Sequence, residues 1–273
     1  MENGSWPTMR AASRAVQRSW PSFVPVAHKL LGRWHIIALT SGVDYARTMT
    51  KFHCNGEPIA HPEDIIPFLA AQERHWRKGR SAYELAHSWM GADDIPCVVA
   101  DVLATRPGLA GARLLVGHFE RSTEIPGCGR ASQTDLLAVC ETSAGKIVIG
   151  VEGKVDETLG PLVSEWDSGT PNKQVRLAGL LDMLGIARAN ADDLRYQLLH
   201  RTAAALIEAR AFGVDRAVML VHSFDPGHAW FDDFSRFAER LGTPCQERGK
   251  LSDWKNADGI NLSIGWCADR PAP

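Results

Sequence analysis

The sequence predicts an α/β fold in which helices flank a mixed central sheet. Three observations carry this prediction. In the middle of the chain a short polar turn separates two apolar segments, two helical patterns follow, and a continuous apolar run comes after the helices. A strand that is apolar along its whole length is typical of a sheet covered by helices on both faces. The order therefore indicates strands and helices that share one core.

The first predicted elements lead up to a hairpin. A helix is expected from Ser81, another over residues 95–104, and a strand over residues 113–117. Residues 133–140 (QTDLLAVC) and 147–151 (IVIGV) are then separated by a polar turn that contains glycine. The second segment is rich in β-branched residues, as strands are. The pattern predicts two antiparallel strands joined by a hairpin.

Two helices and a strand are expected after the hairpin. Residues 175–184 carry leucines at the i, i+3, i+4, i+7 spacing of a helix face, and Gly185 can supply a left-handed cap at the end. A second helix is expected over residues 193–213. Residues 217–221 (AVMLV) then predict a strand buried on both faces.

Length and composition favour one domain. With 273 residues and 45% hydrophobic content the chain can bury a sizeable core. We expect an N-terminal arm and accessory region over residues 1–80 packed on a core at 81–224, with residues 225–273 extending the same domain. No apolar run reaches the roughly 18 residues that a membrane span needs. Six cysteines without CxxC spacing predict reduced thiols and a cytoplasmic location.

Three polar residues stand out in the predicted hairpin. Asp135 lies in the first apolar strand, on the face that also carries Leu137 and Val139. Glu152 and Lys154 close the second strand and share a face, about 7 Å apart along it. If the two faces coincide, two carboxylates and an ammonium converge. Since unpaired buried carboxylates are costly, the arrangement favours a metal site.

At these residues the chain resembles the PD-(D/E)XK nuclease superfamily, whose pattern is an acid, a spacer of this length and (D/E)-x-Lys ending the next strand. Thr134 stands where the proline of that name would be. The resemblance covers residues 81–224 and implies a restriction-endonuclease-like αβββαβ core. It also implies Mg²⁺ or Mn²⁺ held by Asp135, Glu152 and the carbonyl of Gly153, with Lys154 balancing charge that develops in the transition state.

The alternative for these residues is a purely structural role. Asp135 and Glu152 can belong to salt bridges, with Lys154 paired to Glu152 or Asp156. Glu84 is also open to two interpretations. The resemblance implies that a metal-binding acid can come from this first helix, but Ser81 and Glu84 also have the spacing of a capping box.

Gln197 and Arg201 lie four residues apart and therefore on one helix face. The resemblance implies that they support the catalytic site, and the alternative is a solvated stripe that continues to Glu208. Three further polar residues lie at strand ends, where a cap or turn is the expected role: Glu120, His222 and Ser223.

A basic segment precedes the predicted core. Residues 74–80 (RHWRKGR) hold four Lys or Arg around Trp76, a composition suited to phosphate contact and stacking. The alternative is the solvated end of an amphipathic helix over residues 63–76, where cations are favourable. The net charge of −2 argues against a generally basic surface.

Several function classes lack support. The histidines show no paired zinc-like spacing, and GxxxxGK[ST], GxGxxG after a strand and GxSxG are missing. The sequence therefore predicts a Mg²⁺-dependent nuclease or phosphodiesterase, with DNA favoured over RNA as substrate, and is compatible with a homodimer. The alternatives are a non-catalytic binding or interaction protein on the same fold, or an enzyme of another kind on a similar sheet.

Overall fold

The computed structural model describes residues 50–92 and 94–271, which belong to one compact unit. The predicted arm before residue 50 lies outside the described residues. No helix in the described part of the chain is long and apolar enough to cross a membrane.

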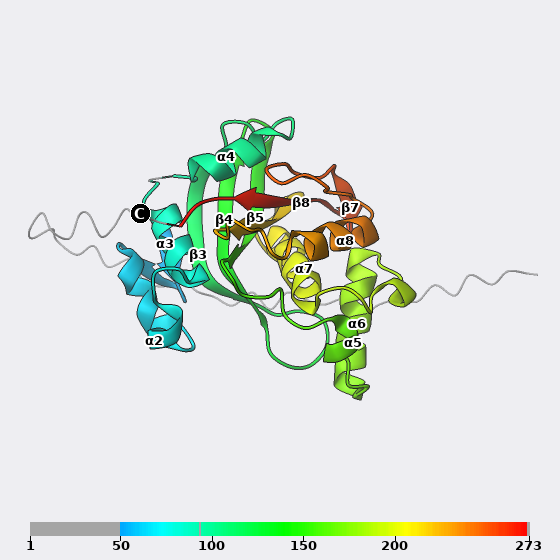
Figure 1. Ribbon diagram of the computed structural model, residues 1–273. Coiled ribbons are helices and arrows are strands. Elements are labelled where there is room, and N and C mark those ends of the chain that lie inside the picture. Colours follow the sequence, from blue (N-terminus) through cyan, green and yellow to red (C-terminus); the bar gives the residue numbers. More distant parts are fainter. Residues whose placement is uncertain (1–49, 93, 272–273) are drawn as a thin grey trace, which may run out of the picture. The chain divides into compact units, whose positions relative to one another are not determined.

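A mixed sheet forms the centre of this unit (Figure 1). Its eight strands lie in the order β2-β1-β3-β4-β5-β6-β8-β7. The middle of the sheet is an antiparallel meander, β3-β4-β5, and β6 and β8 continue it in parallel with β5. The strands are β1 Phe52–Cys54, β2 Glu57–Ile59, β3 Arg113–Thr123, β4 Ser132–Thr142, β5 Gly145–Lys154, β6 Arg216–Ser223, β7 Lys255–Ala257 and β8 Ile260–Ala268.

Helices cover both faces of the sheet. One hydrophobic core lies between the sheet and α3 and α4, and another lies between the sheet and α6, α7 and α8. The predicted α/β class with a mixed sheet flanked by helices is therefore confirmed. The helices are η1 Pro62–Phe68, α2 Gln72–His75, α3 Ser81–Met90, α4 Cys97–Ala104, α5 Val163–Trp166, α6 Pro171–Leu184, η2 Arg188–Asn190, α7 Tyr196–Ala211 and α8 Phe231–Leu241.

The alternation of side chains along β5 sets what faces α7. Ile149 and Val151 belong to the core under α3 and α4, and Val148 to the core under α7. Gly150 follows on the α7 face, where an added Cβ would come within 3.2 Å of the Cβ of Ala205. The missing side chain lets α7 lie close to the strand, directly beside the position of Glu152 two residues later.

The predicted hairpin and helices are present, with one local error. The alternative interpretation of residues 63–76 as one amphipathic helix is wrong, because this stretch is the 3-10 helix η1 followed by the single turn α2. Pro67 lies inside η1 and cannot donate the backbone hydrogen bond that a continuous helix requires. At the other end of the core, Gly185 caps α6 with φ of +66° as predicted.

Candidate functional site

A polar pocket of about 590 Å³ lies at the ends of β3, β4 and β5 next to α7. We call it the acidic pocket. Its floor consists of three carboxylates, two cations and an amide, and its rim includes cations from the segment before α3. The floor residues are Glu120, Asp135, Glu152, Lys154, Gln197 and Arg201, and the rim carries His75 and the cations Arg74 and Arg80.

The three residues that stood out in the sequence meet in this pocket. Lys154 Nζ donates to Glu152 Oε1 at 2.7 Å, and both side chains are buried. The pairing of β4 with β5 ends at Leu136 and Val151. Just beyond that point Asp135 Oδ2 accepts a hydrogen bond from the backbone N–H of Gly153 at 2.9 Å. The predicted coincidence of the two strand faces is therefore confirmed.

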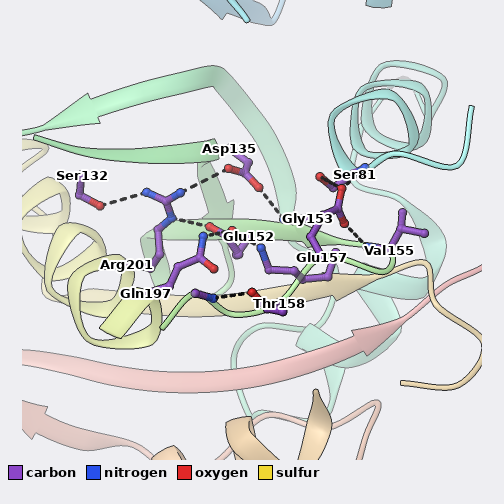
Figure 2. Close-up of polar contacts among 12 residues, drawn as sticks. Ser81, Ser132, Asp135, Glu152, Gly153, Val155, Glu157, Thr158, Gln197 and Arg201 are labelled. Atoms are coloured by element: carbon purple, nitrogen blue, oxygen red, sulfur yellow. Dashed lines mark hydrogen bonds and ion pairs between the residues drawn. The ribbon is translucent and has the colours of Figure 1, made fainter. Parts of the chain in front are cut away.

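Helix α7 supplies the remaining contacts to Glu152, as Figure 2 shows. Gln197 Nε2 donates to Oε1 at 2.7 Å, and Arg201 Nε donates to Oε2. Arg201 also extends its terminal nitrogens to Ser132 Oγ, at 3.2 Å, and toward Asp135 Oδ1, at 3.6 Å. Both oxygens of Glu152 thus accept hydrogen bonds, and Arg201 bridges the two carboxylates.

The alternative of a solvated stripe along α7 is wrong. The side chain of Arg201 is only 11% exposed. Glu208 is buried and accepts hydrogen bonds from Arg121 Nε and Nη2, both at 3.0 Å, and from Thr123 at 2.6 Å. Arg201 and Glu208 therefore face the sheet, and α7 presents charge to the interior at the end next to the pocket.

The carboxyls of the floor differ in their protonation. Burial by itself raises the pKa of Glu152, but the charges of Arg201 and Lys154 outweigh it and hold the pKa at about 2. Burial and the charge of Glu152 raise the pKa of Asp135 to about 7. Burial and the charge of Asp135 raise the pKa of Glu120 to about 8. Near neutral pH Asp135 and Glu120 are therefore partly protonated, because the cations of the floor do not offset burial and the repulsion between neighbouring carboxylates.

Glu120 is a floor residue for which the sequence predicted only a cap or turn. On β3 it lies between Phe119 and Arg121, which pair with Leu136 and Thr134 of β4. Glu120 is therefore opposite Asp135 on the adjacent strand. Its φ of +52° is unusual for a residue other than glycine, and Gln133 Nε2 donates to its Oε2 at 2.7 Å. Only the strand register brings Glu120 to the site, and spacing in the sequence does not reveal register.

Two other residues of the pocket region were missed. Glu157 accepts hydrogen bonds from Val155 N at 2.9 Å and from Ser81 N and Oγ at 3.2 and 3.0 Å, and these donors lower its pKa against the effect of burial. Ser132 joins Arg201 to His200 Nδ1, which lies 2.8 Å from the hydroxyl. In the sequence, Glu157 is marked only by its place shortly after the strand that ends at Lys154. Nothing in the sequence marks Ser132 as a residue of the site.

The predicted capping box of the first helix is wrong. Helix α3 starts at Ser81, so Arg80 is its N-cap, and no side chain caps it. Glu84 is buried, and its Oε1 accepts the N–H of Gly79 at 2.7 Å. It is not among the residues that line the acidic pocket. The position of Glu84 therefore gives no support to a metal-binding role.

The strand-end residues of β6 lie elsewhere too. His222 is fully buried on the α3 side, where Trp89 Nε1 donates to its Nδ1 at 3.2 Å and Asp269 Oδ2 lies 2.9 Å from its Nε2. Ser223 is buried beside it. Neither residue lines the acidic pocket, and this histidine instead joins α3 to the end of β8.

The basic segment contributes to the pocket rim in part. Arg74, His75 and Arg80 line it, and Arg80 Nη1 also pairs with Asp156 at 2.8 Å. Trp76 packs edge-on against Tyr83, with ring centroids 5.4 Å apart. The indole therefore packs on α3, and the contribution of this segment to the pocket is charge.

The oxygen atoms of the floor are suitable ligands for a divalent cation. Within residues 50–92 and 94–271, no three His, Cys, Asp or Glu side chains form a ready chelating group. Mg²⁺ is commonly held by only one or two carboxylates together with water and substrate phosphate. Asp135 and Glu120 supply such carboxyl groups, and a bound cation would favour their ionised form, which burial and mutual repulsion disfavour. Gly153 N–H points to Asp135, and in an extended strand its carbonyl points the same way.

Comparison with known proteins gives a family but no activity. No curated protein and no solved structure matches the chain. A family model described as "Domain of unknown function (DUF6946)" matches residues 58–271. This span contains every residue of the acidic pocket named above. The chain therefore belongs to the DUF6946 family.

Proposed function

We propose that the chain is a nuclease or phosphodiesterase that uses Mg²⁺ or Mn²⁺ to hydrolyse nucleic-acid phosphodiester bonds, with DNA favoured over RNA. One observation carries the proposal. A single pocket joins Asp135, Glu152 and Lys154 on its floor to Arg74 and Arg80 on its rim. The floor can hold a cation and the rim can attract the phosphate backbone, which are the two requirements of phosphodiester hydrolysis.

The order of elements supports the same proposal. Helices α3 and α4, strands β3 to β5, helices α6 and α7 and strand β6 follow one another along the chain. The meander β3-β4-β5 with β6 parallel to β5 is the arrangement expected of a restriction-endonuclease-like αβββαβ core. We propose this core as the fold. The strand β8 and the segment β1-β2 extend it on either side.

The chemistry assigns a role to each floor residue. Asp135, Glu120 and the carbonyl of Gly153 would hold the ion, which supplies a Lewis acid beside the phosphorus. Lys154 stays protonated, because the charge of Glu152 raises its pKa against burial, and can stabilise negative charge on the phosphate oxygens. Glu152 accepts hydrogen bonds from Gln197 and Arg201 and in turn positions Lys154. Burial keeps these charges strong, since water screens them little.

The test is a cleavage assay with defined substrates. Purified full-length protein is incubated with supercoiled plasmid, linear duplex, single-stranded DNA and RNA, each with Mg²⁺, Mn²⁺ or EDTA. We expect cleavage of DNA that requires the metal. Cleavage that persists in EDTA, or that remains unchanged in Glu152→Gln protein, would indicate a contaminating nuclease and refute the assignment.

Arg201 favours a second candidate function. Its guanidinium already bridges Glu152 and Asp135, so a cation is not needed to neutralise Glu152. This arrangement suits a non-catalytic protein that binds nucleic acid on the same fold. Metal-independent binding of DNA without cleavage of any of the four substrates would select this function over hydrolysis.

The rim cations predict a specific dependence on salt. Each Lys or Arg that contacts a phosphate releases nearly one counterion, so replacing Arg74 and Arg80 by Gln should lower the slope of log K against log salt by about 2. The matched control replaces Arg77 and Lys78, which belong to the same segment but are not among the residues lining the pocket. DNA binding is measured in EDTA at several salt concentrations. Equal slopes for the two double variants would exclude the rim as the phosphate-binding surface.

Metal binding should be visible in thermal stability. Above the raised pKa values of Asp135 and Glu120, two neighbouring carboxylates repel each other. Asp135→Asn should therefore raise the melting temperature in EDTA and remove most of the stabilisation that wild type gains from Mg²⁺ or Mn²⁺.

The control is Asp182→Asn, an exposed position on α6, which should change neither quantity. If Asp135→Asn lowers the melting temperature in EDTA and leaves the metal response intact, the carboxylate serves a structural salt bridge to Arg201. That outcome would refute its role as a metal ligand.

A further inference from the structure

A second pocket, of about 330 Å³, lies beside the acidic pocket and is lined by cations. Arg130 comes from the loop between β3 and β4, and Lys173 and Arg176 come from the first two turns of α6. No Asp or Glu lines this pocket. Within the described residues none of the three cations forms a salt bridge. We call it the cationic pocket.

Arg176 is the decisive residue, because it is a buried cation without a counter-charge. It is only 6% exposed. Its terminal nitrogens donate to the carbonyls of Arg130, at 2.5 Å, and Gly127, at 3.5 Å, and its Nε has no hydrogen-bond partner. Burying a charge is costly unless it is paired and hydrogen-bonded. Two carbonyl dipoles do not supply a full negative charge, but an anion in the pocket would.

The loop beside Arg176 contains glycines that lie directly against this residue. Gly127 has φ of +82°, and a Cβ there would come within 2.7 Å of Cα of Arg176. Gly129 has φ of +121° and lies against the guanidinium. Gly179 on α6 similarly makes room for Pro126, since an added Cβ would lie 2.5 Å from the proline Cβ. The absence of side chains at these glycines therefore lets the loop lie directly against α6 beside Arg176.

The other lining groups indicate a compact anion. Asn172 and Lys173 lie in the first turn of α6, which contains no acid, so the positive end of the helix dipole adds to the charge. The ring of Trp166 is stacked on Tyr196, 3.8 Å between centroids, and Lys173 Nζ lies over it at 5.0 Å. With its ring already in contact with both, Trp166 is poorly placed to stack a nucleobase. The pocket therefore suits a charged group such as phosphate.

The two pockets share a wall. Ser132 and His200 line the cationic pocket, whereas their chain neighbours Gln133 and Arg201 line the acidic pocket. Ser132 Oγ lies 2.8 Å from His200 Nδ1 and accepts from Arg201 Nη1 at 3.2 Å. A group bound on one side is thus next to a group bound on the other.

We propose that the cationic pocket binds a phosphate group of the same nucleic-acid strand that is cleaved in the acidic pocket. The phosphate is either a strand-internal diester or a terminal monoester, and Arg176, Lys173 and Arg130 are its ligands. This inference rests on the proposed function for the identity of the ligand. The binding of phosphate itself does not depend on catalysis.

The test measures phosphate binding without metal. Melting temperatures of the full-length protein in EDTA are followed with increasing inorganic phosphate, against sodium chloride at equal ionic strength. The side chain of Arg130 is exposed and that of Lys173 half-buried, so Arg130→Gln and Lys173→Gln should fold. Each should weaken phosphate binding about tenfold, the usual scale for one hydrogen bond to a charged group. The control Lys146→Gln, an exposed position on β5, should leave it unchanged.

Arg176→Gln should abolish the phosphate response, and if that variant does not fold, Arg130→Gln and Lys173→Gln still decide the question. A phosphate response that is equal in wild type, Lys173→Gln and Arg130→Gln would overturn the site. Binding of single-stranded oligonucleotides with and without a 5′-phosphate, also in EDTA, identifies the source. Preference for the 5′-phosphate that disappears in Lys173→Gln assigns a terminal phosphate, and an equal loss of affinity for both assigns an internal one.

The two proposals fail in different ways. A specific phosphate response in a protein that cleaves none of the substrates would keep the cationic pocket and remove the nuclease assignment. Metal-dependent cleavage together with an oligonucleotide affinity that Lys173→Gln leaves unchanged would keep the nuclease and overturn the pocket as a strand-binding subsite.

Discussion

Lys154→Met should lower the rate of metal-dependent DNA cleavage by about 10²- to 10³-fold, the usual effect of removing one preorganised charge partner of a transition state. Glu152 keeps Gln197 and Arg201 as donors in this variant, so the floor keeps its arrangement. The loss should therefore appear in kcat, measured with saturating DNA, while the fold remains intact by circular dichroism.

The control for this experiment is Lys146→Met on the same strand. Lys146 is exposed and does not line the acidic pocket, so its replacement removes the same charge without touching the floor. We expect its kcat to equal that of wild type. If Lys154→Met protein keeps a wild-type kcat, the ammonium is a structural partner of Glu152 and takes no part in the reaction.

Glu152→Gln should lower the free energy of unfolding by about 3 to 5 kcal/mol, the cost of breaking a buried ion pair from one side. Lys154 and Arg201, with side chains 6% and 11% exposed, would lose the carboxylate that pairs with both. Urea denaturation in EDTA measures the change. Because the folded pKa of Glu152 is about 2, below its ordinary 4.5, the stabilisation is complete above pH 4.5 and is lost as the pH falls toward 2.

Two further variants separate the buried pair from general charge effects. Glu152→Gln combined with Lys154→Met removes one of the stranded cations and should recover part of the lost stability. Glu141→Gln breaks an exposed pair with Arg113, whose side chains are 47% and 69% exposed, and should cost no more than about 1 kcal/mol. A cost for Glu152→Gln as small as that for Glu141→Gln would show that the floor is not a buried ion network.

The sequence was informative where a pattern is local. The hairpin of β4 and β5 follows from two apolar runs and a glycine turn, and the shared face of Glu152 and Lys154 follows from the period of a strand. The period of a helix likewise predicts that Gln197 and Arg201 are neighbours, because residues four positions apart lie on the same face of a helix. These features need no knowledge of which strands are neighbours.

What escaped prediction depends on contacts between distant segments. Glu120 reaches the pocket through the register of β3 against β4, and the cationic pocket requires a loop to close on α6. The helix expected over residues 63–76 failed for a different reason. Its apolar spacing suits a helix, but Pro67 lacks the backbone N–H that a continuous α-helix needs at this position.

The contact between Arg201 and Glu152 also bears on when the charge network of the acidic pocket forms during synthesis. The two residues are 49 positions apart, whereas Asp135 and Glu152 belong to adjacent strands of one hairpin. During synthesis the hairpin leaves the ribosome well before α7, so for a time the carboxylates lack the guanidinium that tempers their repulsion. Docking of α7 then completes the charge balance. We expect the nascent protein to remain inert until this late long-range step, so that a truncated chain ending before α7 carries the motif without a working site.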